Sequence, residues 1–479
     1  MWLALTLLLA AAVVLLATTD ALQRTEPLRR VAPVIGRFAG ILRWVKRYPN
    51  LRGNVGPFND IAAHQIRYRA LSGSSESSFG AAVPAKDLER SVAVEVFPAS
   101  STSIDPLRCG PVHSPKSFLL PRINFGALGF GPVSGLVIES VGAAARVHDC
   151  LQNTGEDGLT SHHRASGARL VWQIGTGYAG CRDAFGRFDE HAFQQTLRDY
   201  PTIVAIEVKL SQGAKPGAGG FLPAAKVTPR VARTLGVEPG RAVVSPPEHS
   251  QFDDFPSLLA FLDRLRTLSQ GLPVGIKLCL GSARSAGQLA QALRVHGTPP
   301  DFIVVDGAEG GTGAAPYVLQ HHAGLPARYA VPALHQALKS NGLRDQVRII
   351  ATSGAWNGFH VLEMIALGAD SCYIVRAAMV AIGCISARQC HTGKCPTGIA
   401  TQNPWRRRAI VPQTQGEQLS RFYGSVVDDV HALMRAAGIV SLSDLNESHL
   451  IDLRPSVWSA VDAAQTESSH PASNLEALR

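Results

Sequence analysis

The chain has 479 residues, of which 46% are hydrophobic and 17% are charged. This composition supports a substantial core and excludes a globally disordered chain; it suits one large domain with extensions, or two to three domains. The formal charge is +9. Because no zinc-finger, RNP or basic-zipper pattern accompanies that charge, we expect no nucleic-acid partner.

The first nineteen residues form an uncharged apolar run that ends before Asp20. A helix of this length would be about 28 Å long, close to the hydrocarbon thickness of a bilayer. Basic residues follow the run, and the positive-inside rule then places the rest of the chain in the cytoplasm. We therefore predict a transmembrane helix over residues 1–19 that crosses the cell membrane once, and a juxtamembrane basic segment and linker over residues 20–89. A cleaved export signal is the alternative.

Seven short runs rich in β-branched residues alternate with helical stretches after residue 120, and a further short run near residues 148–155 would make eight. They cover residues 122–127, 148–155, 169–175, 203–210, 273–280, 302–307, 348–354 and 371–377. Alternating buried strands and helices indicate a parallel sheet in an α/β fold. Eight such units over about 260 residues favour a (β/α)8 TIM barrel over an open doubly wound sheet, and no G-x-G-x-x-G follows the first run. We place the barrel within residues 90–424, and a C-terminal helix with a disordered tail in residues 425–479.

The C-terminal ends of the predicted strands carry polar and glycine residues. Chemistry in such barrels sits at these ends. The residues are Gly126, Gln173, Lys209, Lys277, Asp306, Gly354 and Arg376. A barrel with a purely structural role would not need this set, so we predict a ligand site at this rim.

Two glycine-rich turns follow consecutive strands. "DGAEGGTGAAP" (306–316) contains Gly310 and Gly311, and "TSGAWNG" (352–358) opens a helix. Glycine lets backbone N–H groups approach an anion, and a helix N-terminus favours a phosphate. Ordinary tight turns are the alternative for each segment taken singly. Together they predict a phosphorylated ligand, with Arg376 as its counter-charge.

Two lysine-containing segments lie beside that site. Lys277 closes an apolar run, where a buried lysine is costly without a partner; next to a flavin it would stabilise the negative charge of the reduced ring. A lysine that extends to the rim is the alternative. The glycine-rich loop 209–227 could fold over the barrel mouth and present cations to a carboxylate substrate, or it could be a solvated flexible loop.

Three of the eight cysteines, Cys384, Cys390 and Cys395, are concentrated after the last predicted strand. Three thiolates at this C-x5-C-x4-C spacing can hold an iron–sulfur cluster, and a missing fourth ligand suits a three-iron cluster. Zinc with His391 as a fourth ligand, or three free cysteines, are the alternatives. The cysteines as a whole do not form a dense disulfide framework.

The motifs "NFGALG", "NTGEDG", "SQGAKPGAGGFLPAAKV", "VVSPPEH", "VVDGAEGGTGAAP" and "GCISARQCHTGKCPTGIATQNP" occur in this order. With them the chain from about residue 90 to 410 resembles the FMN-binding synthase domain of glutamate synthase. The resemblance implies a (β/α)8 barrel, bound FMN, and reduction of 2-iminoglutarate (from 2-oxoglutarate and ammonia) to L-glutamate. It implies a 3Fe–4S cluster on the three clustered cysteines. It implies FMN contacts at Gly126, Ala127, Gln173, Lys277, Asp306, Gly310, Gly311, Gly354 and Arg376. Lys209, Gln212 and Lys215 would be the catalytic residues.

The chain departs from the family pattern at several points. No glutaminase domain precedes the barrel, so ammonia would come from solution or from a separate glutaminase subunit. Ala218 and Phe221 stand where the family loop has Glu and Gln. Leu235 and Asp254 align with an arginine and a serine that contact the keto acid. No NAD(P)H fingerprint is visible, which favours a ferredoxin-like electron donor.

Two other functions remain open at this point. The chain could be an FMN and iron–sulfur oxidoreductase for another small amino or keto acid, similar to N-methylglutamate synthase. It could also be a non-catalytic electron-transfer subunit.

Overall fold

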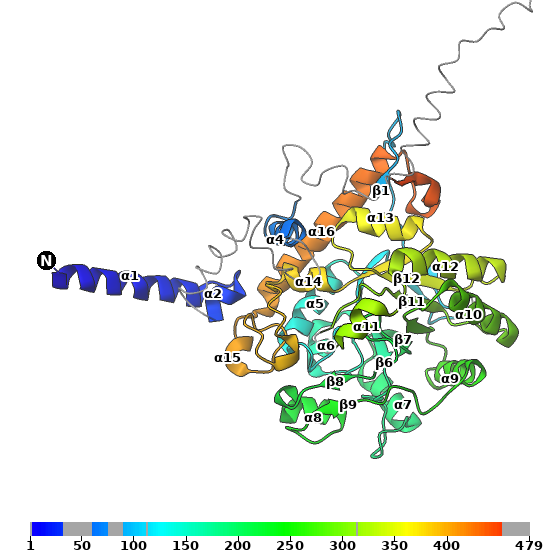
Figure 1. The fold of residues 1–479 in the computed structure, drawn as a ribbon, viewed down its shortest axis with the longest axis horizontal. Coiled ribbons are helices and arrows are strands. Elements are labelled where there is room, and N and C mark those ends of the chain that lie inside the picture. The colour runs from blue at the N-terminus through cyan, green and yellow to red at the C-terminus, as the bar shows by residue number, and fades with distance from the viewer. Residues whose placement is uncertain (1, 32–59, 75–89, 112–113, 313–314, 453–479) are drawn as a thin grey trace, which may run out of the picture.

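The computed structural model describes residues 2–31, 60–74, 90–111, 114–312 and 315–452. Its centre is a closed barrel of eight parallel strands, which confirms the predicted TIM barrel (Figure 1). The barrel strands, in order around the barrel, are β4 (Ile123–Phe125), β5 (Leu151–Asn153), β6 (Arg169–Ile174), β7 (Ile203–Lys209), β10 (Val274–Leu278), β11 (Phe302–Asp306), β12 (Arg348–Thr352) and β13 (Ser371–Ile374). Each lies within one of the eight predicted runs.

Helices surround the barrel on the outside. They present apolar faces to the strands and polar faces outward, as the alternation in the sequence predicts. The layer contains α5 (Gly135–Val147), α6 (Ser161–Ser166), α7 (Glu190–Asp199), α9 (Phe255–Leu268), α10 (Ala283–His296), α12 (Ala327–Ser340), α13 (Gly358–Ala366) and α14 (Arg376–Ala381). Shorter elements lie in the connections: β8 (Phe221–Leu222), α8 (Pro229–Leu235), β9 (Val243–Val244), α11 (Tyr317–His322) and α15 (Pro404–Arg407).

The barrel interior is apolar at one end and polar at the other. The apolar end packs buried side chains from six barrel strands against the antiparallel hairpin of β2 (Leu107–Cys109) and β3 (Phe118–Leu120). Side chains on a strand alternate between its faces, so Ala205, Glu207 and Lys209 of β7 share one face, and Ala205 belongs to this apolar end. The interior therefore becomes charged toward the C-terminal ends of the strands, where the sequence predicts the site.

The two ends of the chain add helices to one side of the barrel. α16 (Pro412–Ala436) packs against α5 and against α4 (Asp60–Ser72), and Arg69 of α4 pairs with Asp429 of α16. β1 (Arg90–Val92) pairs antiparallel with β14 (Leu450–Asp452). α16 thus runs across residue 424, where the sequence analysis placed the end of the barrel segment. The predicted tail falls mostly in residues 453–479, and much of the predicted linker in 32–59 and 75–89, outside the described residues.

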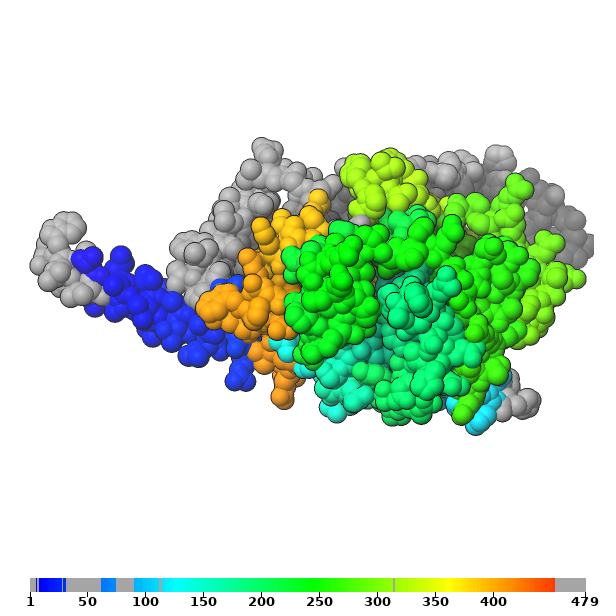
Figure 2. Space-filling model, turned by 90° about the horizontal axis from the view of Figure 1, so that it is seen from below, coloured from blue at the N-terminus to red at the C-terminus, as the bar shows by residue number. Residues whose placement is uncertain are grey.

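The apolar run at the start of the chain forms a helix, α1 (Trp2–Leu22), that projects from the body (Figures 1 and 2). Within the described part of the chain, no helix is both long enough and apolar enough to cross a membrane. The predicted transmembrane helix over residues 1–19 is therefore not found. That prediction ended the helix before Asp20, whereas the helix includes this charged residue, which is only 1% exposed.

The turn after α1 is tied to the body of the molecule. It leads into α2 (Pro27–Val31). Gln415 Nε2 donates to the Arg24 carbonyl oxygen and Gln418 Nε2 to that of Thr25, each at 3.1 Å. Both glutamines belong to α16, so the end of α1 is fixed against the helix that covers the barrel. The cytoplasmic location of the barrel stays a prediction.

Candidate active site

A buried carboxylate, Glu207, lies at the centre of the polar end of the barrel. It is fully buried and accepts hydrogen bonds from Asn153 Nδ2, at 2.9 Å, and from Gln173 Nε2. Burial raises the pKa of Glu207 above its ordinary value, although Lys277 partly offsets this. Because its Nε2 is held by the carboxylate, the amide of Gln173 has a fixed orientation.

Lys277 on β10 forms an ion pair with the neighbouring strand β11. Its Nζ lies 3.4 Å from Asp306 Oδ2 on β11, and both side chains are buried. Burial by itself would lower the pKa of Lys277, but the carboxylates of Asp306 and Glu207 raise it above the ordinary value. The lysine is therefore a fixed positive charge inside the barrel and does not extend freely to the rim.

The two glycine-rich turns meet at Arg376, the first residue of α14. A Cβ on Gly311 would lie 2.9 Å from Arg376 Nη1, and a Cβ on Gly354 would lie 2.9 Å from Nη2. Gly354 also has φ +75°, a conformation that favours glycine. The guanidinium thus sits against backbone that has no side chains, which is the arrangement that an anion-binding cradle needs. Gly310 lies beside Asp306 at the edge of the same turn.

The remaining predicted FMN contacts lie at the end of β4. Gly126 N–H donates to the carbonyl oxygen of Ile374, at 3.1 Å, and Ala127 follows it. A Cβ on Gly126 would lie 2.6 Å from Val375 Cγ2, so the backbone of β4 passes close to the end of β13. The structure therefore places the predicted cofactor residues around one barrel mouth.

Of the three predicted catalytic residues, Lys209 ends β7, and Gln212 and Lys215 lie in the loop that follows it. Lys209 Nζ donates to Glu156 Oε1, at 2.7 Å, and to Gln212 Oε1, at 3.0 Å. Lys215 is also buried, and its Nζ donates to the Gly219 carbonyl oxygen. A Cβ on Gly213 would lie 1.9 Å from the Gly307 carbonyl oxygen. The loop is therefore packed onto the mouth, as predicted by the interpretation in which it folds over the barrel.

A cavity at this mouth joins the loops after several strands. It has a charged side and an apolar side, which suits a small polar ligand with a carbon chain. Its lining consists of Pro132, Glu156, Asp157, Gly177, Ala179, Arg182, Gln212, Lys215, Gly220, Phe221, Leu222, Leu235, Val243, Ser245 and Thr312. Phe221 and Leu235, two of the departures from the family pattern, are in this lining, whereas Asp254 caps α9 instead.

Two acidic residues of the "NTGEDG" segment face this cavity. Burial would raise the pKa of Glu156, but Lys209 and Lys215 outweigh it and hold that pKa below its usual range. Burial and the neighbouring Glu156 raise the pKa of Asp157 to about 7. Two adjacent carboxyl groups with pKa values pushed apart are typical of sites that use one acid as a charge and the other as a proton carrier.

The three clustered cysteines lie in the loop after α14. Burial is the main cause that raises the pKa of Cys384, to about 11, and Cys390 and Cys395 add to it, so the three thiols are within electrostatic range of one another. The buried Lys226 lies within electrostatic range of Cys390 and Cys395. Among the described residues, no three histidine, cysteine, aspartate or glutamate side chains are grouped so that they could hold a metal ion. The structure therefore brings the thiols near one another without an assembled ligand set.

The cysteine loop packs beside the mouth. A Cβ on Gly393 would lie 3.6 Å from Lys226 Cγ, in the loop after β7. Gln402 Nε2 donates to the carbonyl oxygens of Gly131 and Val133, in the loop after β4. Figure 2 shows this segment, in orange, against the green surface that follows β7. The predicted neighbourhood of cysteines and barrel rim is thus present.

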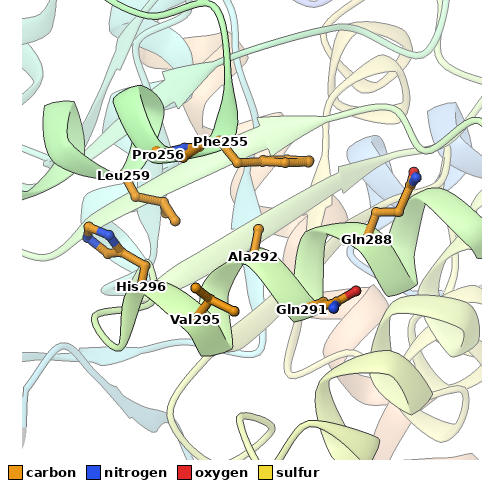
Figure 3. A pocket seen from close by; sticks show the side chains of 8 residues that line it. All are labelled: Phe255, Pro256, Leu259, Gln288, Gln291, Ala292, Val295 and His296. Atoms are coloured by element: carbon orange, nitrogen blue, oxygen red, sulfur yellow. The ribbon is translucent and has the colours of Figure 1, made fainter.

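A larger pocket lies away from the barrel mouth and lacks the carboxylates, lysines and arginines found there. It has a volume of about 680 Å³ and lies between α9 and α10 on the outer helical layer (Figure 3). Apart from His296, which contacts Asp263, its lining carries no ionisable side chain. Because charged groups converge at the strand ends instead, we take the mouth as the candidate active site.

Four charged residues at the mouth were not predicted from the sequence: Glu156, Asp157, Arg182 and Glu207. Glu207 carried a signal, because an acid inside the apolar run "IVAIEVKL" must be buried and paired. Glu156 and Asp157 follow a strand end directly. Arg182 lies in a turn with no distinguishing pattern.

Comparisons with known proteins support the same assignment. A family model described as a conserved region in glutamate synthase matches residues 101–440. The glutamate synthase large subunit-like protein YerD of Bacillus subtilis is 38% identical over 299 residues, which cover 62% of this chain and 56% of that protein. An archaeal-type glutamate synthase (NADPH) of Thermotoga neapolitana is 32% identical over 334 residues, covering 69% of this chain and 62% of that protein. The chain thus spans less than two thirds of the length of these curated relatives.

Among solved structures, the flavin-binding domain of baker's yeast flavocytochrome b2 is similar with a TM-score of 0.46 at 11% identity, covering 84% of each chain. The family match begins before β4 and ends beyond α16, so it includes every strand end at the mouth. The chain belongs to the glutamate synthase family.

Proposed function

We propose that this chain is an FMN-dependent oxidoreductase of the glutamate synthase type. It reduces 2-iminoglutarate, formed from 2-oxoglutarate and ammonia, to L-glutamate. The observation that carries the proposal is the convergence, at one barrel mouth, of the Arg376 cradle, the Lys277 charge, and Lys209 and Lys215. Membership of the family makes this chemistry the first to test.

The residues present fit FMN. The backbone at Gly311 and Gly354, together with Arg376, would hold the phosphate, because glycine leaves room there and the guanidinium supplies opposite charge. Lys277 would place a positive charge at the inner side of the mouth, and Gln173 would present an oriented amide. When bound, FMN supplies hydride transfer.

The residues around the cavity fit an anionic acid. Lys215 and Gln212 line the cavity and can hold a carboxylate, while Lys209 balances the charge of Glu156. Reduction of an imine consumes a proton, and Asp157 is an acid in the cavity wall whose pKa of about 7 lets it hold one near neutral pH. The cavity thus supplies charge for binding and a proton for the reaction.

Other parts of the proposal rest on the sequence pattern. We assign a 3Fe–4S cluster to Cys384, Cys390 and Cys395, and a ferredoxin-like protein as the electron donor. Thiolates are the ligands that such clusters require, and Lys226 would offset some of their negative charge. Several relatives are named as NADPH enzymes. A separate glutaminase subunit remains a candidate source of ammonia.

An anaerobic assay tests the proposal. The purified protein should show flavin absorbance, and with a chemical one-electron donor it should convert 2-oxoglutarate and ammonia to L-glutamate. Flavin without turnover on any oxo acid would favour an electron-transfer subunit. Turnover with methylamine in place of ammonia would favour the chemistry of N-methylglutamate synthesis. Absence of flavin would remove the basis of the proposal.

The cluster assignment makes a separate prediction about iron. Cys390→Ala should lose the bound iron, because removing one of three thiolate ligands leaves the cluster without attachment. Cys390 is half-buried and a methyl group fits in its place, so the far-ultraviolet circular dichroism should match the wild type. Cys279→Ala, a half-buried cysteine outside the loop, is the matched control and should keep its iron. Iron retained in Cys390→Ala would reject this ligand set, and loss of the fold would indicate a structural metal such as zinc.

A further inference from the structure

Arg182 is a cation of the mouth that the proposed chemistry does not use. It follows β6 and lines the same cavity as Gln212 and Lys215. Its Nη1 donates to the carbonyl oxygens of Gly177 and Leu235, at 3.3 and 3.4 Å. Its Nε is buried and makes no hydrogen bond within the described part of the chain.

These contacts leave the guanidinium poorly satisfied. Hydrogen bonds of 3.3 and 3.4 Å are longer than the usual 2.7–3.2 Å, and both acceptors are neutral. A buried donor without a partner costs free energy, and a charged donor costs more. Among the described residues, no carboxylate lies within ion-pair distance of Arg182. The side chain therefore has the capacity to bind an anion that comes from outside the chain.

The surrounding backbone holds the side chain in place. Gly186 and Gly236 flank it, and both have positive φ values, +82° and +65°. A Cβ on Gly186 would lie 2.6 Å from Arg182 Nη2, and one on Gly236 would lie 3.5 Å from Arg182 Cδ. An arginine that is already positioned loses less conformational entropy when it binds a ligand, and its planar group matches a carboxylate.

The cavity then has two cationic groups and an apolar wall. Lys215 comes from the loop after β7 and Arg182 from the loop after β6, while Phe221, Leu222 and Val243 provide carbon surface. A monocarboxylic oxo acid would use only one of these cations. A dicarboxylic acid with a short methylene chain would use both cations and the wall.

We propose that Arg182 binds the second carboxylate of a dicarboxylic oxo or imino acid, and so selects dicarboxylic over monocarboxylic substrates. The inference rests on the proposed function, because it assumes that the substrate occupies this cavity. Arg182 contacts the carbonyl oxygen of Leu235, the residue that stands where the family pattern has an arginine that contacts the keto acid. In this chain, the arginine that binds the carboxylate would then come from the loop after β6.

The test compares two acids with the same carbon chain. 2-Oxoglutarate and 2-oxopentanoate, which lacks the second carboxylate, are titrated calorimetrically into the purified full-length protein and into Arg182→Met. The wild type should bind 2-oxoglutarate more tightly by at least about tenfold, as expected for a charged hydrogen-bonded pair. Arg182→Met should lose this preference and keep its affinity for 2-oxopentanoate. Arg182→Lys, which keeps the charge, should restore part of the preference.

The control and the outcomes separate the inference from the proposed function. Arg187→Met removes an exposed arginine from the same turn and should leave both affinities unchanged. The ratio of the two affinities within one variant does not depend on the fraction of folded protein. A preference for 2-oxoglutarate that survives in Arg182→Met overturns the inference alone, as does a wild type that binds both acids equally. A wild type that binds neither acid overturns the inference together with the proposed function.

Discussion

Replacing Lys277 by methionine is expected to lower the free energy of unfolding by about 3–5 kcal/mol at neutral pH, the usual cost of removing one partner of a buried ion pair. Lys277 lies 3.4 Å from Asp306, and both side chains are buried. Methionine fills a similar volume, so the lowered free energy of unfolding would reflect the removal of the charge more than a change in packing. Asp306 and Glu207 would remain inside the barrel with no cation between them. Chemical denaturation of wild type and variant measures the difference.

The same variant should show a changed dependence on pH. Burial already raises the pKa of Glu207, and Lys277 opposes that rise, so removing the lysine should raise the pKa further. A carboxyl with a raised pKa in the folded state contributes stability below its unfolded pKa of about 4.3, and this contribution is lost as pH rises toward the folded value. Lys277→Met should therefore be least defective near pH 5 and most defective near pH 8.

Two further variants provide the controls. Lys339→Met removes an exposed lysine from the end of α12 and should change stability by less than about 0.5 kcal/mol. Adding Asp306→Asn to Lys277→Met removes one of the two uncompensated carboxylates and should recover part of the lost stability. If Lys277→Met unfolds at the same denaturant concentration as the wild type at both pH values, the charge inside the barrel is not a stabilising pair.

The sequence was sufficient to predict the barrel because its local signals agree with the global fold. Seven of the eight barrel strands contain β-branched residues, and all eight are buried at most of their positions. Since all strands of a closed parallel barrel end at one rim, residues far apart in sequence, such as Lys277 and Arg376, could be placed together. The same reasoning predicted that the glycine turns at Gly311 and Gly354 lie at this rim.

Other features depended on contacts that no local pattern encodes. The contact between Arg182 and the Leu235 carbonyl oxygen forms only because the turn that carries Arg182 packs against a segment more than fifty residues away. The difference between the pKa values of Glu156 and Asp157 depends on Lys209, at the end of β7, and on Lys215, in the loop after it. Helix α1 extends to Leu22, beyond the predicted end at residue 19. Hydropathy alone does not show that the segment after this helix is held against α16 by hydrogen bonds. These features are set by tertiary packing, which a single sequence does not display.

Replacing Lys209 by methionine is expected to reduce kcat/KM for 2-oxoglutarate by at least about 100-fold, the effect of removing one oriented charge from an active site. Lys209 holds both the Glu156 carboxylate and the Gln212 amide. Without it, Glu156 would face the cavity with less positive charge beside it and would repel an anionic substrate, while Gln212 would lose its orientation. Steady-state kinetics of the variant, compared with those of Lys339→Met, measures the loss.

The pH dependence of the Lys209 variant separates this role from general unfolding. Lys209 is the largest influence that holds the pKa of Glu156 below its usual range, against burial. A depressed carboxyl pKa contributes stability above the unfolded value of about 4.3, and this is lost as pH falls through the folded value. Lys209→Met should thus differ most from the wild type in stability at neutral pH and little in strong acid. Lys209→Gln, which keeps a donor but no charge, should share that pH profile. If it regained full activity, the hydrogen bond to Gln212, and not the positive charge, would be what the reaction needs.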